Sequence, residues 1–209
     1  MAKRFISVTG FVLAGGASRR MGRDKVQLLL AGETLLARQV RLLSGVCRSV
    51  TVVGPAQVFP QLGARIIPDA IPGCGPLGGI FRGLHRTRTE YNLILGCDLP
   101  FLTPRFLRFL AERALESRAD VTLAQSPDRK LQPLCAVWRR QTLSRLRLSL
   151  QAGKFKTGAF CQRATCRVLP WAELARARFT PRLFANLNSP GDYEAAVRAM
   201  GPAVVCRKG

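Results

Sequence analysis

The stretch that decides the fold is Phe11-Val-Leu-Ala-Gly-Gly-Ala-Ser-Arg-Arg-Met-Gly-Arg-Asp-Lys25, in which an apolar run opens into a glycine-rich loop. The run from Ile6 to Leu13 has the length and composition of a buried β-strand. Gly15 and Gly16 follow it, and glycine lets a backbone turn sharply while leaving its amide groups uncovered by side chains. The pattern therefore predicts a buried strand that ends in a tight, open turn.

The loop after this strand carries positive charge at Arg19, Arg20 and Lys25. Uncovered amides together with fixed cations suit the oxygens of a polyphosphate. Two common phosphate-binding patterns, Gly-x-Gly-x-x-Gly and Gly-x4-Gly-Lys-Ser/Thr, are not present here. The loop predicts a polyphosphate site, and the alternative is a basic surface loop with no ligand.

Length and composition predict one globular domain, residues 1–209, with 47% hydrophobic and 22% charged residues. Apolar runs such as 92–95 and 50–53 have the length of strands and are too short to span a membrane. No apolar signal core precedes the first glycine loop, so we expect a soluble, cytoplasmic protein with no membrane partner. Seven cysteines without a Cys-x-x-Cys pair argue against a disulfide framework or a zinc ribbon.

The net charge of +21 indicates an anionic partner, which could be nucleic acid, phosphates or an acidic protein. The arginines are spread from Arg4 to Arg207 without a run of five, and the few aromatic residues are not interleaved with them. A basic surface with anionic small substrates explains this better than nucleic acid does. A non-catalytic nucleic-acid-binding module remains the alternative from a different functional class.

Apolar runs alternate with amphipathic helical patterns along the whole chain, which is typical of an α/β fold. We expect a Rossmann-like, mostly parallel sheet with helices on both faces. The expected strands are 6–13, 49–53, 65–67, 91–95, 119–125, 134–138 and 166–169. The expected helices are 33–43, a glycine-rich loop at 72–79 leading into a helix to about 85, a helix starting at Pro104 behind an N-cap at Thr103, 141–151, and a last helix capped by Ser189 and Asp192.

Two aspartates, Asp69 and Asp98, follow strand-like runs and so are expected at the carboxyl edge of the sheet, where open α/β sheets bind ligands. A carboxylate beside a phosphate loop suits Mg²⁺, which takes one or two carboxylates together with phosphate oxygens. The alternative for each aspartate is an ordinary role in a turn or a helix cap.

Five segments in this order resemble the molybdenum cofactor guanylyltransferase family over residues 9–197. The segments are Leu13-Ala-Gly-Gly-x-x-x-Arg-Met-Gly-x-Asp-Lys25, Gly75-Pro-Leu-x-Gly79, Asp98-Leu-Pro100, Gln132-Pro133 and Asn186-Leu-Asn188-Ser-Pro190. The resemblance implies the nucleotide-diphospho-sugar transferase type of fold. It also implies transfer of GMP from GTP to the phosphate of molybdopterin cofactor, with Mg²⁺ as cofactor and pyrophosphate as the second product. We expect a monomer that makes transient contact with molybdoenzyme-maturation proteins.

The resemblance also assigns roles to residues. It implies catalytic roles for Arg19, Lys25 and Asp98, with Asp98 also the metal ligand. The residues that it places at the nucleotide are Leu13, Ala14, Gly15, Gly16, Lys25, Gly54, Asp69, Gly75, Pro76, Leu77 and Asp98. It places Asn186 and Asn188 at the acceptor.

This chain departs from the family pattern at two places. Gly54 stands where family members often carry asparagine, and Phe155 separates Lys154 from Lys156 where the family often has two adjacent basic residues. Related enzymes that use another nucleotide are the nearest alternatives, among them cytidylyltransferases and sugar-phosphate nucleotidyltransferases. The cytidine-using branch usually has Leu-Ala-Ala-Gly, so Gly15 favours guanine.

Overall fold

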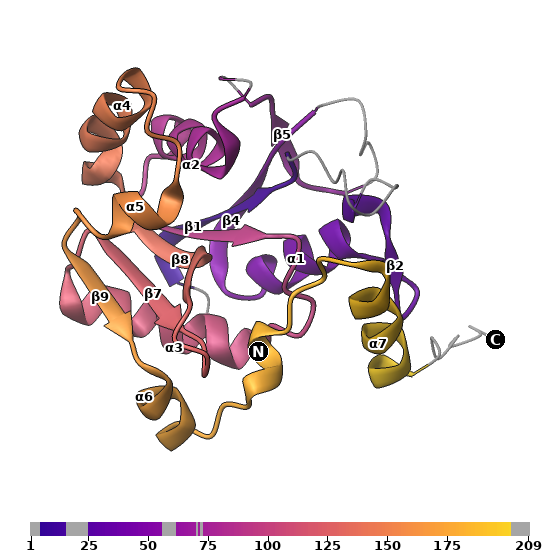
Figure 1. The fold of residues 1–209 in the computed structure, drawn as a ribbon. Helices are drawn as coiled ribbons and strands as arrows, with labels where there is room; N and C mark the ends of the chain where they lie inside the picture. The colour runs from indigo at the N-terminus through magenta and orange to yellow at the C-terminus, as the bar shows by residue number, and fades with distance from the viewer. Residues whose placement is uncertain (1–4, 16–24, 56–61, 70, 72, 202–209) are drawn as a thin grey trace.

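The computed structural model describes residues 5–15, 25–55, 62–69, 71 and 73–201, which are built around a seven-stranded sheet (Figure 1). The strand order is β5-β4-β1-β6-β8-β7-β9. Within these residues β8 alone runs against the other strands of this sheet, so the sheet is mostly parallel. The strands are β1 (Phe5–Leu13), β4 (Cys47–Val53), β5 (Arg65–Ile67), β6 (Tyr91–Gly96), β7 (Val121–Gln125), β8 (Leu131–Arg139) and β9 (Cys166–Leu169).

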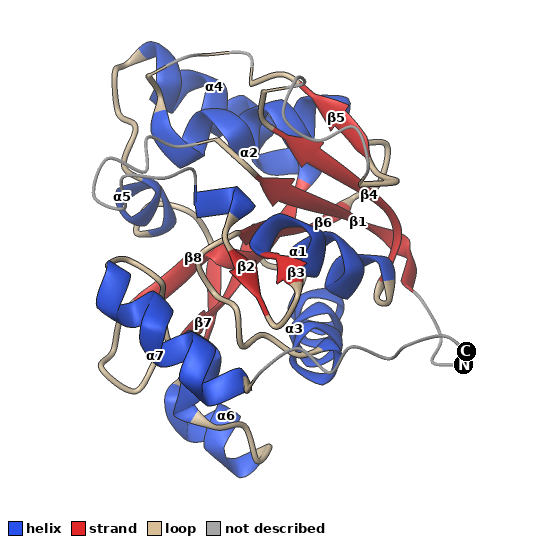
Figure 2. Ribbon diagram, turned by 90° about the vertical axis from the view of Figure 1, so that its right-hand side faces the viewer, coloured by secondary structure: helices blue, strands red, loops and turns tan. Residues whose placement is uncertain are grey.

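Helices cover both faces of the sheet (Figures 1 and 2). α1 (Leu35–Ser44) and α3 (Pro104–Ser117) pack on one face, and α2 (Gly75–Arg86), α4 (Leu143–Gln151) and α5 (Thr157–Cys161) pack on the other. The remaining elements are η1 (Lys25–Gln27), the hairpin of β2 (Leu29–Leu30) and β3 (Glu33–Thr34), η3 (Arg140–Thr142), α6 (Trp171–Arg176), η4 (Pro181–Phe184) and α7 (Pro190–Met200). None of the described helices is long and apolar enough to cross a membrane.

Alternation along β1 divides the core into two layers. Val8 and Val12 point toward α1 and α3, whereas Phe11 and Leu13 point toward α2. The second layer is tight because α2 presents glycines to the strand. A Cβ built on Gly79 would lie 3.2 Å from Leu13 Cδ2, and one on Gly83 would lie 3.1 Å from the Phe11 ring. This contact holds the first turns of α2 against the end of β1.

The expected α/β fold with a mostly parallel sheet is confirmed, and so are the caps of two helices. Thr103 Oγ1 accepts a hydrogen bond of 3.2 Å from the amide of Phe106, and Ser189 forms the predicted capping box with Asp192. Most element boundaries shift by one or two residues. The helix expected from residue 33 begins at 35, because Glu33 and Thr34 pair with β2 and Thr34 Oγ1 accepts from the amide of Ala37.

One expectation was wrong: residues 75–79 are not a loop but the first turns of α2. Pro76 is compatible with a helix there because proline is tolerated in the first turn, where its missing N–H would have no partner. The short helices α5 and α6 and the β2–β3 hairpin were not predicted. Each spans six residues or fewer, which is too short for a periodic pattern to stand out.

Candidate active site

Ala14 and Gly15 at the start of the first loop, both candidate aspartates and the start of α2 lie at the carboxyl edge of the parallel strands. The chain leaves β1 for β4 on one side and later returns to β6 on the other, so the strand order reverses beside β1. Ligands of open α/β sheets bind in the crevice at such a point. Since β8 is antiparallel to β6, it begins at this edge and brings Gln132 and Pro133 to it.

Ala14 and Gly15 begin the first loop as an extension of the sheet. The amide of Ala14 donates a hydrogen bond of 2.8 Å to the carbonyl of Val53, and the amide of Gly54 donates one of 3.0 Å to the carbonyl of Ile67. The backbone at Gly15 does not have a positive φ, and among the described residues a Cβ there would meet only the Asp69 carboxylate, at 3.7 Å. The backbone conformation and the described neighbours of Gly15 would therefore admit alanine.

Gly54 is more constrained than Gly15. A Cβ at this position would lie 3.0 Å from Ala14 Cβ and 3.2 Å from the Ala14 carbonyl carbon. The asparagine that family members often carry here would therefore need Ala14 to move. The observed position of Ala14, at the start of the first loop, therefore depends on glycine at residue 54.

Asp69 lies between the first loop and α2. Its two carboxylate oxygens are each 3.7 Å from an ideal Cβ position, Oδ2 at Gly15 and Oδ1 at Gly78. The amide of Ile71 donates a long hydrogen bond of 3.4 Å to Oδ1, so the side chain also shapes its own turn. The turn role and a role at the site are compatible, because the carboxylate is half-buried and faces the first loop.

The start of α2 faces the same edge. Gly75 has a φ of +59°, which favours glycine, and Gly75 and Pro76 are exposed. The first amides of a helix have no partner within the helix and carry partial positive charge, which suits an anion. The side chain of Leu77 is fully buried in the core, so this residue can offer only its backbone to a ligand.

Asp98 follows β6, and α1 holds the backbone of its loop. The buried amide of Gln39 donates a hydrogen bond of 2.9 Å from Nε2 to the carbonyl of Leu99, and Arg38 Nε donates one of 2.6 Å to the carbonyl of Pro100. The Asp98 side chain is half-buried and makes no hydrogen bond or ion pair with the residues that the structure describes. A carboxylate held on a fixed backbone, with free oxygens, suits a role as metal ligand.

The predicted acceptor segment lies against the Asp98 loop. The amide of Leu187, between Asn186 and Asn188, donates a hydrogen bond of 2.9 Å to the carbonyl of Asp98. Leu187 is buried, Asn186 is half-buried, and Asn188 is exposed. The two asparagines therefore flank a buried anchor next to the candidate metal ligand.

Several expected site residues cannot be placed. Gly16 and Arg19 lie outside the described residues, and so does the side chain of Lys25.

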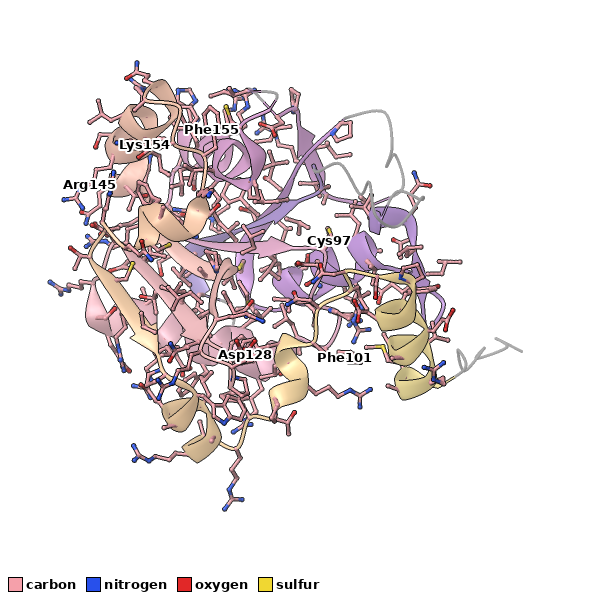
Figure 3. All side chains as sticks on the ribbon, in the orientation of Figure 1. Cys97, Phe101, Asp128, Arg145, Lys154 and Phe155 are labelled. Atoms are coloured by element: carbon pink, nitrogen blue, oxygen red, sulfur yellow. The ribbon has the colours of Figure 1, made fainter. Side chains whose placement is uncertain are left out.

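Lys154, Phe155 and Lys156 line a cavity of about 310 Å³ between α4 and α5. Figure 3 shows Lys154 and Phe155 beside α4, separated from Cys97 at the Asp98 loop. The departure from the family pattern at Phe155 thus lies in a cavity that none of the predicted site residues lines.

Cysteines near Asp98 are not suited to nucleophilic chemistry. Burial and, to a lesser extent, the Asp98 carboxylate raise the pKa of the Cys135 thiol far above its ordinary value. Cys97 is also buried, and its thiol lies 3.6 Å from the carbonyl oxygen of Leu13. Both thiols therefore act as small packing groups that join β6 to its neighbours.

Sequence reasoning did not find Gln39, Arg38 or Leu187, which support the site through its backbone. Gln39 occupies a fully buried position in α1, and in the sequence it is a single polar residue on the apolar face of an amphipathic helix. A polar residue on the apolar side of a helix was the available signal, because a buried amide needs a partner. The antiparallel direction of β8 carried no such signal.

Comparison with known proteins identifies the family of this chain. Residues 10–164 match the model of the MobA-like NTP transferase domain. A probable molybdenum cofactor guanylyltransferase of Chloroflexus aggregans is 34% identical over 203 residues, which cover 93% of this chain and 95% of that protein. One of Mycobacterium tuberculosis is 37% identical over 204 residues, covering 95% of this chain and 97% of the relative.

Solved structures share the fold. Molybdopterin-guanine dinucleotide biosynthesis protein A of Archaeoglobus fulgidus has a TM-score of 0.79 at 22% identity, covering 91% of this chain and 97% of that one. The 2-C-methyl-D-erythritol 4-phosphate cytidylyltransferase of Thermus thermophilus has a TM-score of 0.66 at 14% identity, covering 90% and 96%. These structural similarities concern the fold alone, since nucleotidyltransferases of different substrates share it.

Proposed function

The chain belongs to the MobA-like NTP transferase family, and from this premise we propose that it is a molybdenum cofactor guanylyltransferase. In the proposed reaction it transfers GMP from GTP to the terminal phosphate of molybdopterin cofactor and releases pyrophosphate. The observation that carries the proposal is the meeting of Gly15, Asp69 and the amino end of α2 at one edge of the sheet, next to Asp98. Curated relatives with this name are 34% and 37% identical over nearly their whole length.

The proposed chemistry needs alignment and charge neutralisation rather than an activated side chain. The attacking group is a phosphate oxygen, which is already an anion, so no general base is required to form it. That oxygen forms a bond to the α-phosphorus of GTP while the bond from the α-phosphorus to the bridging oxygen breaks. Pyrophosphate leaves with the electron pair of the broken bond, so no atom is oxidised or reduced and no further reactant is needed.

The chain's own residues divide these tasks by position. The amides of Ala14, Gly15 and Gly16 would hold the nucleotide, while Arg19 and Lys25 would offset the charge of its triphosphate. Asp69 lies where it can accept hydrogen bonds from base or ribose, beside Gly15 and the start of α2. Asn186 and Asn188 would orient the acceptor from the segment anchored to Asp98.

The residues present fit one divalent cation. Among the described residues no group of three or more His, Cys, Asp or Glu side chains could enclose a metal, but Mg²⁺ needs only one or two carboxylates when phosphates supply the rest. The Asp98 carboxylate has no hydrogen bond or ion pair with any described residue, and it would hold the cation. The bound cation supplies charge neutralisation at the phosphates.

The proposal is tested by incubating the protein with Mg²⁺, molybdopterin cofactor and each of the four nucleoside triphosphates separately. We expect pyrophosphate and a dinucleotide product with GTP. Product with CTP in place of GTP would overturn the choice of nucleotide. Absence of pyrophosphate with every nucleotide, in protein that melts cooperatively, would overturn the proposed activity. The same incubation with EDTA tests the requirement for a divalent cation.

A further inference from the structure

A groove of about 770 Å³ lies on the α2 face of the sheet, at the end of α2 remote from the candidate active site. Strands β1, β4 and β5 form its floor, and the segment from α2 to β6 forms its wall. α2 begins at the carboxyl edge with Gly75 and ends at Arg86, and its 12 residues span about 18 Å. The floor of the groove reaches Ile67 at the end of β5, but most of its arginines lie around the last turn of α2 and toward the amino ends of the parallel strands, away from that edge.

Five arginines from four parts of the chain converge on this groove. Arg48 comes from β4, Arg65 from β5, Arg86 and Arg88 from the end of α2 and the following segment, and Arg140 from η3. All five are exposed, and none forms an ion pair or side-chain hydrogen bond with another residue in the described part of the chain. Unpaired like charges repel one another, and surfaces usually intersperse the two signs.

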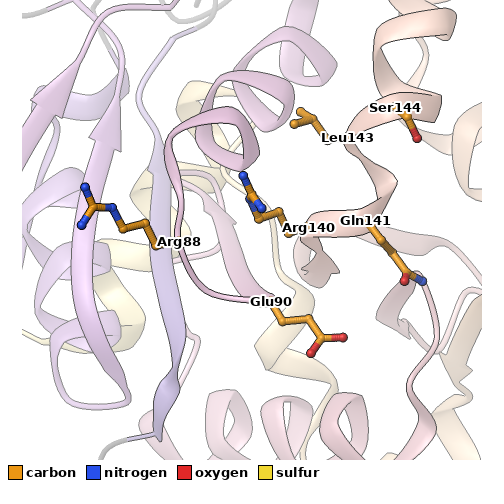
Figure 4. A pocket seen from close by; sticks show the side chains of 6 residues that line it. All are labelled: Arg88, Glu90, Arg140, Gln141, Leu143 and Ser144. Atoms are coloured by element: carbon orange, nitrogen blue, oxygen red, sulfur yellow. The ribbon is translucent and has the colours of Figure 1, made fainter.

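A neighbouring carboxylate, that of Glu90, does not neutralise these five arginines. Glu90 lies in the adjoining pocket with Arg88 and Arg140, as Figure 4 shows, but its ion-pair partner is Arg139. Other arginines, among them Arg41, Arg145 and Arg167, each pair with a carboxylate. The groove differs from a scattered set of surface arginines because it brings five of them, without an ion pair among the described residues, to one concavity.

Hydroxyl groups complete the lining. Thr9, Ser49 and Thr51 occupy the positions on β1 and β4 that face the α2 side, where apolar residues would be expected under a helix. Thr9 is buried and accepts a hydrogen bond of 2.8 Å from Thr89, so the floor is fixed by its own polar contacts. Hydroxyls and guanidinium forks are the donors that phosphate oxygens bind best.

We propose that this groove binds a small ligand bearing a chain of phosphates, such as an inorganic polyphosphate or a nucleoside polyphosphate. Its volume is within the roughly 300–1,000 Å³ that small-ligand pockets occupy. Nucleic acid fits less well, since the groove has no exposed Phe, Tyr or Trp ring on which a base could stack: its Phe11 is 2% exposed, and His85 is the one exposed ring in its lining. The phosphate chain is the part recognised, because the donors surround the groove and no carboxylate or amide side chain lines it to select a base.

The test is a two-dimensional NMR titration with inorganic tripolyphosphate and, separately, with GTP. Backbone amides report the location directly: Thr87 and Thr89 for the groove, and Gly15 and Leu99 for the candidate active site. We expect tripolyphosphate to saturate the groove amides. Absence of saturation of the groove amides by tripolyphosphate would overturn the proposal, and so would saturation by a short single-stranded DNA at lower concentration than tripolyphosphate.

Two double variants that lose the same charge distinguish a specific binding site from non-specific electrostatic attraction to a basic protein. Arg48→Gln/Arg88→Gln removes two groove cations, and Arg147→Gln/Arg176→Gln removes two exposed arginines elsewhere. We expect the first to weaken the groove Kd by at least about tenfold, as the loss of charge-assisted hydrogen bonds does, while the second leaves it within about twofold. Equal weakening in both would overturn the proposal. GTP turnover should be unchanged in both, so failure here is independent of the proposed transferase activity.

Discussion

The backbone amide of Leu187 donates a hydrogen bond of 2.9 Å to the carbonyl oxygen of Asp98. This single bond joins the segment proposed to orient the acceptor to the loop proposed to hold the metal. Gln39 supports the same loop from the opposite side through the carbonyl of Leu99. The Asp98 loop is therefore fixed by residues from an early helix and from a late segment of the chain.

Asp98→Asn should abolish nucleotidyl transfer and leave the melting temperature within a few degrees of the wild type. The substitution keeps the shape of the side chain and removes the charge that would hold Mg²⁺. Pyrophosphate release at increasing Mg²⁺ concentration is the measurement. Glu116→Gln on α3 is the matched control, since it removes a carboxylate from an exposed helix position. Activity of Asp98→Asn within a few-fold of the wild type at saturating Mg²⁺ would contradict the metal-ligand role.

Gln39→Leu should destabilise the protein by about 1–3 kcal/mol, because the Leu99 carbonyl loses its buried donor. It should also raise the Mg²⁺ concentration needed for half-maximal activity, since Asp98 precedes that carbonyl. Thermal melting gives the first quantity and a Mg²⁺ titration of activity gives the second. Gln141→Leu removes a hydrogen bond to Asp120 at the other end of β8. This control should lower the stability of the protein and leave the Mg²⁺ dependence of activity unchanged. If both variants show the same Mg²⁺ dependence, Gln39 has only a structural role.

Gly15→Ala should lower kcat/KM for GTP by roughly 10–200-fold, the range for a misfit of about one methylene-sized group. The added methyl group would occupy space at the turn where the nucleotide is proposed to lie. Stability should stay within about 0.5 kcal/mol of the wild type, because the nearest atom of the described residues to the new Cβ is an Asp69 oxygen at 3.7 Å. The ratio of kcat/KM for GTP and CTP, in both proteins, is the measurement. An equal fall with both nucleotides would mean that Gly15 does not select the base.

Gly54→Ala should destabilise the protein by about 1–3 kcal/mol, the usual cost of inserting a methyl group into a packed site. The reason is the 3.0 Å approach of the new Cβ to Ala14 Cβ. Since Ala14 begins the first loop, KM for GTP should rise as well. Chemical denaturation and steady-state kinetics measure the two effects. Gly158→Ala in α5 is the control, because no atom lies within 4 Å of its ideal Cβ and its stability should not fall.

The sequence predicted most of the fold because the long elements carry strong local patterns. The apolar runs of β1 and β6 and the capping box of α7 each specify one structure. The direction of β8 could not be predicted, since an antiparallel strand between parallel ones has the same apolar character. The start of α2 was misjudged because Gly75, Gly78 and Gly79 indicate a loop by local preference. Close packing of Gly79 against Leu13 overrides that preference.

The candidate site was predictable where side chains carry its chemistry and not where the backbone does. Asp69 and Asp98 were found because each is an acidic residue after a strand in a chain with few acidic residues. The contact of Asp69 with Gly15 and the support from Gln39 and Leu187 depend on tertiary structure. No pattern within one segment reports a hydrogen bond to a backbone carbonyl far along the chain.

The pairing of β6 with β8 has a consequence for how the protein folds. Asn92 and Trp138 are 46 residues apart in sequence, and Cys97 and Leu13 are 84 apart, yet both contacts lie in the strands that carry the site. Closing such long loops is slow relative to forming local helices. The binding edge should therefore form late in folding and be absent from early intermediates. A nascent chain released before β8 is synthesised would contain the first glycine loop and Asp98 but not the neighbouring strand that completes their edge.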